Sequence, residues 1–428
     1  MSEEAASVVR AWLRHIQTAE FGEIAVRSSE PWQEGGEKEI NLSINRIVEE
    51  EEDEEDGKIV YSDGMRYIGP VRDHQPQGRG QLTLSDGRLV SGEFLSGSLS
   101  GVVRSVSPQD SSLTETLYHR GLPHGTWRHS SLEGRLLGYG MTSSGARVGR
   151  TLVVGSGGNS YYLGCLDSRD KLSGEVVFLY PCLQTAIVGQ YKAGKLISGH
   201  YRTISRASVQ DGFISLEFEP GLGREVLYDP PSCFSISRRP LETDLYEERT
   251  VRVAESSVPG AGEGLFARRR LSSGDLVCLF SGSKIYKDNT RRSLQFGDEE
   301  WSDFRITLDK SVDLDIGPEY RSCHQYRATL GHKACHHFQL RNSAFQEFEH
   351  PRFGRIMSIV AVRDIEEDEE IFVSYNYSLP LSPPWYQDLW FSHCRDKGLA
   401  KERILELVTR EVGRWGVSME IPEFITNL

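Results

Sequence analysis

The chain has 428 residues, enough for two or three domains with sizeable cores. With 38% hydrophobic and 26% charged residues the composition is that of a globular protein, and no apolar stretch approaches the roughly 20 residues of a membrane helix. The net charge is −13, of which the run Glu49–Asp56 carries −8. The negative net charge argues against direct binding to nucleic acid and favours a basic partner, such as a lysine-containing peptide.

The seven cysteines are an odd, scattered set without a C-x-x-C pair. We therefore expect a reducing compartment, the nucleus or the cytoplasm. The first residues, MSEEAAS, are acidic and lack the apolar segment of a secretory signal.

Residues 1–58 are expected to form an N-terminal helix followed by an acidic disordered linker. Apolar residues recur at helical spacing in the first 20 positions, at Val8, Val9, Trp12, Leu13 and Ile16. Residues 21–58 are polar and end in the acidic run, whose like charges repel. The alternative to a solvated linker is that this acidic run contacts a basic partner.

Residues 59–205 contain an internal repeat of about 24 residues. Its glycines are Gly78, Gly101, Gly125, Gly149, Gly174 and Gly199. Alternating apolar and polar residues beside Asp-Gly turns predict β-hairpins, which should stack into an elongated sheet. A binding surface for protein or lipid is one interpretation of this sheet, and a structural scaffold is the other.

After the repeat we expect a connector over 206–249, a second domain over 250–378 and a helical segment over 379–428. The connector contains Pro230-Pro231, and the glycine period stops after residue 250. The segment 399–415 places Ile404, Val408, Val412 and Trp415 on one helix face, which should pack on the protein or on a partner.

The second domain contains an ordered series of motifs. They are GAGEGLF (260–266), LGHKACHHFQLRN (330–342), HPRFG (350–354), DEEIFVSYNY (368–377) and PPWYQ (383–387). A Gly-x-Gly loop such as 262–264 lets the backbone approach a ligand closely, although any tight turn has the same pattern. The motifs in this order are more specific than any one of them.

Taken together, these motifs resemble a SET domain, and YIGPVRDHQPQGRGQLTLSDG (67–87) resembles MORN repeats. Over residues 60 to 392 the chain resembles the MORN-repeat SET-domain protein-lysine methyltransferases, a family of this architecture whose activities include monomethylation of histone H3 lysine 4. The resemblance implies a mainly β fold, in which a MORN-repeat hairpin sheet precedes a knotted β SET domain with a C-terminal helix that closes the site. It also implies a monomeric chromatin regulator that uses S-adenosyl-L-methionine and acts on histone tails or other basic proteins.

The resemblance also implies roles for individual residues. It assigns Tyr375 to methyl transfer and Tyr377 to the lysine channel, and it aligns Phe280 and Phe345 with two channel tyrosines of the family. The implied cofactor-binding residues are Ala261, Gly262, Glu263, Gly264, Lys333, Cys335, His336 and Trp385, with Trp385 stacking on the adenine. An aromatic channel suits this chemistry, because desolvation favours the neutral amine of a lysine whose pKa is ordinarily about 10.4.

Two departures from the family pattern bear on activity. Cys335 and His337 stand where the family has Asn and Ser, and the lost hydrogen bonds, about 0.5–1.5 kcal/mol each, would weaken cofactor binding about tenfold. Asn342 matches a later Asn of the motif after one inserted residue. Without the hydroxyls of two tyrosines, the channel at Phe280 and Phe345 has more room, so we expect it to tolerate a second methyl group.

Other functions remain open. Cys335 and the two phenylalanines also fit a catalytically inactive SET fold that serves as a scaffold or binding protein. A MORN-mediated adaptor at a membrane surface is disfavoured by the negative charge. Metal binding is not expected, because the Cys and His residues lack the paired spacing of zinc ligands; they are Cys323, His324, His332, Cys335, His336, His337 and His350.

Overall fold

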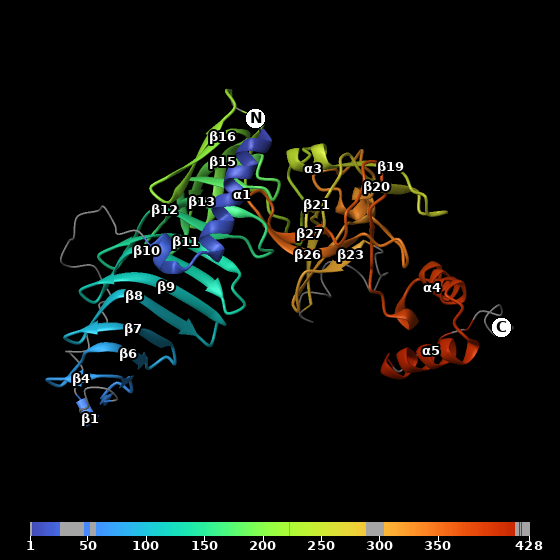
Figure 1. Ribbon diagram of the computed structural model, residues 1–428. Coiled ribbons are helices and arrows are strands. Elements are labelled where there is room, and N and C mark those ends of the chain that lie inside the picture. The colour runs from blue at the N-terminus through green and yellow to red at the C-terminus, as the bar shows by residue number, and fades with distance from the viewer. Residues whose placement is uncertain are drawn as a thin grey trace. The chain divides into compact units, whose positions relative to one another are not determined.

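The structure is a computed structural model that describes residues 2–25, 47–51, 57–221, 223–287, 304–415, 419 and 421. It divides the chain into two compact units. The first, which we call the hairpin unit, contains residues 1–230 and 347–355. The second, the catalytic-motif unit, contains residues 231–346 and 356–428. The described residues are mainly β, as the sequence predicted (Figure 1).

The hairpin unit is built on a 16-stranded antiparallel sheet, in which almost every strand pairs with its neighbour in sequence (Figure 1). Its strands are β1 (Ile47–Glu51), β2 (Lys58–Tyr61), β3 (Arg66–Ile68), β6 (Gly78–Thr83), β7 (Leu89–Leu95), β8 (Ser98–Ser107), β9 (Ser112–His119), β10 (Leu122–Ser131), β11 (Leu136–Ser143), β12 (Ala146–Val154), β13 (Tyr161–Leu166), β14 (Leu172–Leu179), β15 (Thr185–Lys192), β16 (Lys195–Gln210), β17 (Phe213–Phe218) and β18 (Glu225–Val226). A separate short pair consists of β4 (Val71–Arg72) and β5 (Gln75–Pro76).

Four of the six repeating glycines lie at β-bulges. Five of them have φ between +64° and +133°, a range that side chains rarely adopt; they are Gly78, Gly101, Gly125, Gly149 and Gly174. The last four lie where the pairing register shifts within a hairpin. A bulge adds one residue and increases the local twist. The glycine period in the sequence is therefore the period of the bulges.

The side chain of Tyr67 fills the space beside two further glycines, Gly69 and Gly80. Tyr67 is fully buried, and its hydroxyl donates to the carbonyl of Pro70 at 3.0 Å. A Cβ atom on Gly69 would lie 2.6 Å from this hydroxyl, and the ring lies against Gly80 as well. The tyrosine-x-glycine and glycine-x-glycine patterns thus describe one packing contact between neighbouring strands.

Helix α1 (Ser2–Thr18) packs on this sheet, against β16, and is followed by the short helix α2 (Phe21–Ile24). Val9, Trp12, Leu13 and Ile16 are buried, which confirms the predicted apolar face. The indole N–H of Trp12 donates to the carbonyl of Gly212 at 3.1 Å. The N-terminal helix is therefore part of the hairpin unit's core.

A buried arginine holds the end of α1. The guanidinium of Arg128 donates to the carbonyls of Ile16 at 3.1 Å and Ala19 at 2.8 Å, and its Nε donates to the carboxylate of Glu115 at 2.9 Å. The last carbonyls of a helix carry partial negative charge, so a cation is favourable there. Arg128 thus joins α1 to strands β9 and β10.

Two segments differ from the sequence-based expectation. Strand β16 continues through the predicted repeat boundary at 205 as far as Gln210, because residues 204–210 pair with β17. Glu49, Glu50 and Glu51, predicted to lie in a disordered linker, belong to β1 and pair with β2. The other residues of the predicted linker, except 21–25, 47, 48, 57 and 58, lie outside the described part of the chain.

The catalytic-motif unit contains short strands in several small sheets. Its elements are α3 (Leu245–Thr250), β19 (Val251–Glu255), β20 (Glu263–Ala267), β21 (Leu276–Phe280), β22 (Ser283–Tyr286), β23 (Arg305–Thr307), β24 (Val312–Asp315), η2 (Pro318–Tyr320), η3 (Gly331–Lys333), β25 (Cys335–His336), β26 (Ser343–His350), β27 (Gly354–Ala361), β28 (Phe372–Val373), η4 (Leu379–Leu381), α4 (Pro384–Asp396) and α5 (Lys401–Trp415). The end of β26 and the start of β27 cluster with the hairpin unit.

Two long-range pairings position the motifs. Strand β25 pairs in parallel with β28, which brings residues 335–336 beside 372–373. The buried carboxylate of Glu247 on α3 accepts hydrogen bonds from the N–H groups of Leu279 at 2.6 Å and Leu330 at 3.2 Å. It thereby holds β21 beside the residues that precede η3.

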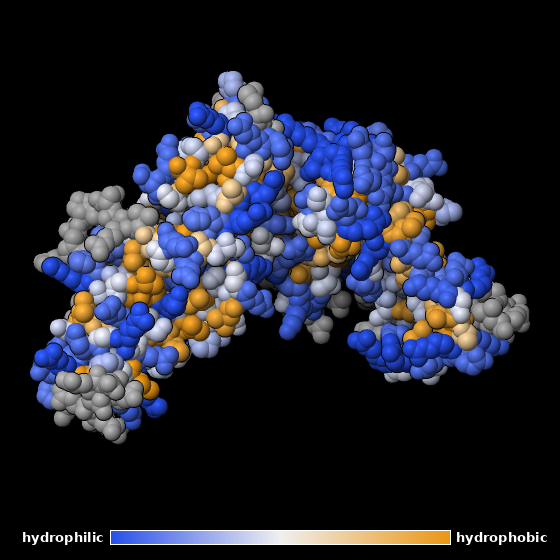
Figure 2. Space-filling model, in the orientation of Figure 1, coloured by the Kyte–Doolittle hydropathy of each residue, from blue (hydrophilic) through white to orange (hydrophobic). Residues whose placement is uncertain are grey.

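The C-terminal helices pack on the same unit. Ile404 and Val408 of α5 are buried with Leu379, Tyr386 and Phe391, and Val412 packs against this cluster, as the predicted helix face requires. In Figure 2 an apolar area on this helical pair is bordered by hydrophilic residues.

Candidate active site

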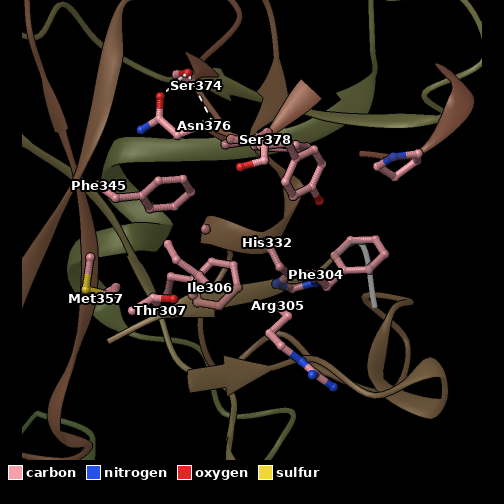
Figure 3. A pocket seen from close by; sticks show the side chains of 16 residues that line it. Phe304, Arg305, Ile306, Thr307, His332, Phe345, Met357, Ser374, Asn376 and Ser378 are labelled. Atoms are coloured by element: carbon pink, nitrogen blue, oxygen red, sulfur yellow. Dashed lines mark hydrogen bonds between the residues drawn. The ribbon is translucent and has the colours of Figure 1, made fainter. Parts of the chain in front are cut away.

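A cavity of about 540 Å³ lies among β21, β23, η3, β26, β27 and the segment that follows β28 (Figure 3). Its lining residues are Phe280, Phe304, Arg305, Ile306, Thr307, Gly331, His332, Ala334, Phe345, Met357, Ser374, Tyr375, Asn376, Tyr377, Ser378 and Pro383. We call it the first cavity. The structure therefore brings together both tyrosines and both phenylalanines of the predicted channel.

The phenylalanines form an apolar side of the first cavity. Phe280 and Phe345 meet edge to face with ring centroids 6.0 Å apart, and Met357 lies on the same side (Figure 3). Gly331 is required beside them, because a Cβ atom there would lie 2.6 Å from the carbonyl oxygen of Leu279.

Tyr375 has a fixed hydrogen-bond geometry. Its hydroxyl donates to the carbonyl of Ala334 at 2.9 Å, and Ala334 also lines the first cavity. Its backbone N–H donates to Nδ1 of His336 at 3.2 Å. The Tyr377 ring lies 5.6 Å from the Tyr375 ring. The phenol oxygen of Tyr375 is therefore held at the cavity wall.

The predicted cofactor loop is held by a buried carboxylate that the sequence analysis did not single out. Glu370 accepts hydrogen bonds from the hydroxyls of Ser256 and Ser257, both at 2.6 Å, and from the N–H of Ser257 at 2.8 Å. A Cβ atom on Gly264 would lie 2.4 Å from this carboxylate, and Gly262 has φ +74°. Both glycines are thus required by the loop's conformation.

Lys333 places a cation beside this loop. Its ammonium donates to the carboxylate of Glu263 at 2.6 Å and to the carbonyl of Arg321. The Lys333 side chain is nearly buried, while that of Glu263 is half exposed. Ala261, by contrast, is exposed at the tip of the loop, where its N–H donates to the carbonyl of Val258.

Cys335 is buried next to the same loop. Its Sγ lies 3.6 Å from the carbonyl oxygen of Glu263, and burial raises the pKa of the thiol, so the thiol is protonated at neutral pH. It offers one weak hydrogen bond where an amide would offer several.

Asn342 supplies amide hydrogen bonds at the crossing of β26 and β28. Its Nδ2 donates to the carbonyl of Glu370 at 2.7 Å, and its Oδ1 accepts from the N–H of Phe372 at 2.9 Å and the hydroxyl of Ser343 at 3.1 Å. Asn342 is fully buried. It ties the two chain segments together next to the cofactor motif.

Two buried histidines are neutral. Burial lowers the pKa of His336 to about 4 and that of His332, which lines the first cavity, to about 3. Because Nδ1 of His336 accepts a hydrogen bond, its proton resides on Nε2, and this nitrogen has no hydrogen-bond partner among the described residues. His332 was not predicted as a site residue.

The start of α4 exposes Trp385 and buries Tyr386. The Trp385 side chain is 42% exposed and meets the rings of Tyr375 and Tyr377 edge to face at 6.2 and 6.3 Å. Tyr386 is 4% exposed, and its ring lies 4.9 Å from that of His336. Successive helical residues point about 100° apart, so only one of the two can face His336.

A second cavity of about 490 Å³ shares the segment Ser374–Ser378 with the first. Its lining residues are Phe338, Ser374, Asn376, Tyr377, Ser378, Leu379, Tyr386, Trp390, Leu407, Arg410, Glu411 and Arg414. Four of these belong to α5, which lies within the C-terminal helical segment 379–428 that was predicted to close the site.

Among the residues that the structure describes, no group of three or more His, Cys, Asp or Glu side chains is placed to hold a metal ion. None of the helices described has both the length and the apolar character needed to cross a bilayer.

Comparison with known proteins agrees with this geometry. Residues 262–376 match the family model of the SET domain. The chain is 28% identical over 256 residues to histone-lysine N-methyltransferase SETD7 of Halocynthia roretzi, an alignment that covers 59% of this chain and 64% of that protein. It is also 26% identical over 152 residues to the variant-silencing SET domain-containing protein of Plasmodium falciparum (isolate 3D7), covering 34% of this chain and 5% of that protein.

The chain thus spans less than two thirds of the length of these relatives. The matched SET residues contain the cofactor loop, η3, β25 and Tyr375, all of which lie in the catalytic-motif unit. Residues 262–376 therefore match a SET domain, with a hairpin sheet before them in the sequence and helices after them, and the chain is similar to a histone-lysine methyltransferase.

Proposed function

We propose that the chain is an S-adenosylmethionine-dependent protein-lysine N-methyltransferase. The observation that carries the proposal is the Tyr375 hydroxyl, held by Ala334 at the wall of an aromatic cavity inside a SET domain. When bound, the cofactor supplies a methyl group on a sulfonium, which an amine nitrogen attacks directly.

The first cavity favours the form of lysine that reacts. A lysine ammonium has a pKa near 10.4, so only about one in a few thousand is neutral at pH 7. Phe280, Phe345 and Met357 make one side of the cavity apolar, and a desolvated ammonium releases its proton more readily.

Tyr375 orients the amine. Because the hydroxyl donates its proton to the carbonyl of Ala334, the phenol oxygen can act toward the substrate only as an acceptor of an N–H. Holding the amine in this way points its lone pair along the remaining direction, and alignment of this kind supplies much of the acceleration in group transfer.

Among the described residues that line the cavity there is no carboxylate, and His332, with a pKa of about 3, is a poor base. The substrate's proton therefore leaves to water rather than to a side chain of the cavity. The rate should rise about tenfold per pH unit on the acidic side of the substrate's own titration.

The residues of the cofactor motif fit S-adenosylmethionine. Gly262 and Gly264 give a loop without side chains, Lys333 offers a cation for the cofactor's carboxylate, and Glu263 offers an anion for its ammonium. The Nε2–H of His336, which has no partner within the described part of the chain, is a buried donor in the same motif. Among these residues of the cofactor motif, Cys335 offers the weakest hydrogen bond to a cofactor.

The substrate class follows from charge. A net charge of −13 attracts a lysine-rich segment, so we propose basic proteins, histone tails or others, as substrates in the nucleus or the cytoplasm. The two phenylalanines leave room for a second methyl group on the amine.

The test is transfer of labelled methyl groups to histones and a panel of lysine peptides by the full chain. We expect Tyr375→Phe to lower kcat at least about a hundredfold through loss of positioning, with cofactor binding retained. Tyr118→Phe, in the hairpin sheet, is the matched control. If the wild type binds the cofactor but methylates nothing, or if Tyr375→Phe is as active as the wild type, the enzyme proposal is wrong and the scaffold function takes its place.

A further inference from the structure

The ring of His337 accepts two backbone hydrogen bonds. Its Nδ1 accepts from the N–H of Gln339 at 3.1 Å and from that of Leu340 at 2.9 Å. The backbone N–H of His337 donates to the carbonyl of Val373 at 3.3 Å, next to the pairing of β25 with β28. From the sequence we expected His337 only to cost hydrogen bonds, whereas in the structure its imidazole is the acceptor that closes the turn 338–340.

This turn places Phe338 between two parts of the predicted cofactor site. The Phe338 ring lies 4.3 Å from the ring of His336 in the cofactor motif. It also packs against α4, with ring centroids 5.2 Å from that of Tyr386 and 5.1 Å from that of His393. Trp385, another predicted cofactor residue, lies in the first turn of α4. A displacement of Phe338 would therefore disturb the motif and the helix together.

The two hydrogen bonds to the His337 ring require a neutral imidazole. A neutral ring has one nitrogen that donates and one that accepts, so an accepting Nδ1 places the proton on Nε2. When the ring gains a second proton, Nδ1 becomes a donor that points at two other donors. Both N–H groups of the turn then lose their acceptor at once.

We propose that His337 is a positioning residue that holds Phe338 in place only while its ring is neutral, so that acidification weakens cofactor binding. This inference rests on the proposed function. Burial lowers the pKa of His337 below its usual 6.5, although the nearby carboxylate of Glu370 acts in the opposite direction. Because the pKa of the folded form is lowered, the closed turn is fully stable above pH 6.5 and is lost as the pH falls through the lowered value.

Three titratable side chains among the described residues interact with the charge of His337. His336 and His393 of α4 each share charge repulsion with it, whereas the carboxylate of Glu370 attracts a proton to its ring. The pKa of His336 is about 4, so His336 stays neutral at mildly acidic pH. His393 stacks on Phe338 with 24° between the ring planes, and a cation over an aromatic face is favourable. Protonation of His393 would therefore keep Phe338 in place, and only protonation of His337 releases it.

The test is calorimetry of S-adenosylhomocysteine, the demethylated cofactor, with the full chain at pH 7.5 and at pH 5. His337→Asn keeps an acceptor at the position of Nδ1 but does not take up a proton, so it should match the wild type at pH 7.5. From pH 7.5 to pH 5 the affinity of the wild type should fall at least about threefold more than that of His337→Asn, because one proton must leave before binding. His337→Leu removes the acceptor and should bind about tenfold more weakly at pH 7.5. If His337→Leu does not fold, the comparison of the wild type with His337→Asn still decides.

Two further variants identify the titrating group. His324→Asn, at an exposed position of the same unit, is the matched control and should keep the wild-type pH dependence. His393→Phe retains a ring that stacks on Phe338 and should keep this pH dependence as well. A pH dependence that persists in His337→Asn, or that disappears in His393→Phe, would overturn the inference and leave the proposed function standing. A wild type that does not bind S-adenosylhomocysteine at pH 7.5 would overturn both.

Discussion

In the hairpin unit, almost every strand pairs with the strand before it, whereas in the catalytic-motif unit Cys335 pairs with Phe372 and Glu247 bonds to Leu279 and Leu330. The sheet is held by local contacts that repeat along the chain. The site is held by single polar side chains that join distant segments. Stability is thus spread over many equal contacts in one unit and concentrated in few in the other.

In each unit a buried polar side chain with amide or guanidinium donors joins several backbone segments. Arg128 does so in the hairpin unit, and Asn342 in the catalytic-motif unit. Substitution of these two residues sharpens the comparison, because each should destabilise its own unit and leave the other unchanged.

The largest effect is expected for Arg128→Leu. It leaves the nearly buried carboxylate of Glu115 without its main partner and removes two donors from the end of α1, so the hairpin unit should lose about 3–5 kcal/mol of unfolding free energy. Hydrogen exchange read by mass spectrometry should show α1 exchanging faster. Arg104→Leu removes the exposed partner of the same carboxylate and should cost less than about 1 kcal/mol.

A smaller loss, about 3 kcal/mol, is expected for Asn342→Leu. The buried N–H of Phe372 and the carbonyl of Glu370 each lose a partner, and exchange should rise in β25 and β28 while the hairpin strands stay protected. Gln325→Leu, at an exposed position of the same unit, is the control. Uniform destabilisation of both units would contradict the division between local and long-range stabilisation.

Local stabilisation explains why the fold was largely predictable. The glycine period marks the bulges of four successive hairpins, and the apolar spacing of residues 8–16 and 404–412 marks helix faces that the structure buries. Glu49–Glu51 escaped prediction, because their strand depends on pairing with β2 rather than on their own composition.

Site residues could be predicted only at positions that a sequence motif specifies. Phe280, Phe345, Tyr375 and Tyr377 do line one cavity. Glu370 could not be assigned from the sequence, since its neighbours Glu367, Asp368 and Glu369 have the same chemistry and only the fold buries this one. The helical phase that turns Tyr386 rather than Trp385 toward His336 depends on where α4 begins, which a motif does not specify.

The next effect is pH dependence, which should be greater in the catalytic-motif unit. Burial holds the pKa of His332 at about 3 and of His336 at about 4, below the usual 6.5, so the unfolded chain binds protons first as the pH falls. Stability from these two groups is full above pH 6.5 and is lost toward pH 4. From pH 7.5 to 5.5 the loss is about 2–3 kcal/mol.

Urea unfolding of the full chain at the two pH values, followed by hydrogen exchange, measures this loss unit by unit. His332→Phe should remove about half of it. In the hairpin unit burial also lowers the pKa of His129, but Thr114 keeps a hydrogen bond to its ring, so we expect a weaker response. An equal or larger response of the hairpin unit would contradict the interpretation.

The smallest effect concerns the product. If the space beside Phe345 admits a second methyl group, the wild type should accumulate dimethyl-lysine on a peptide, and Phe345→Tyr should shift the ratio toward monomethyl-lysine about fivefold, the value of one hydrogen bond from a restored hydroxyl. Mass spectrometry of the peptide measures the ratio, and Phe234→Tyr, at a fully exposed ring, is the control. Since Phe280 meets Phe345 edge to face, Phe280→Tyr should act in the same direction. A wild-type product that stays monomethylated at long times would show that cavity size does not set the product.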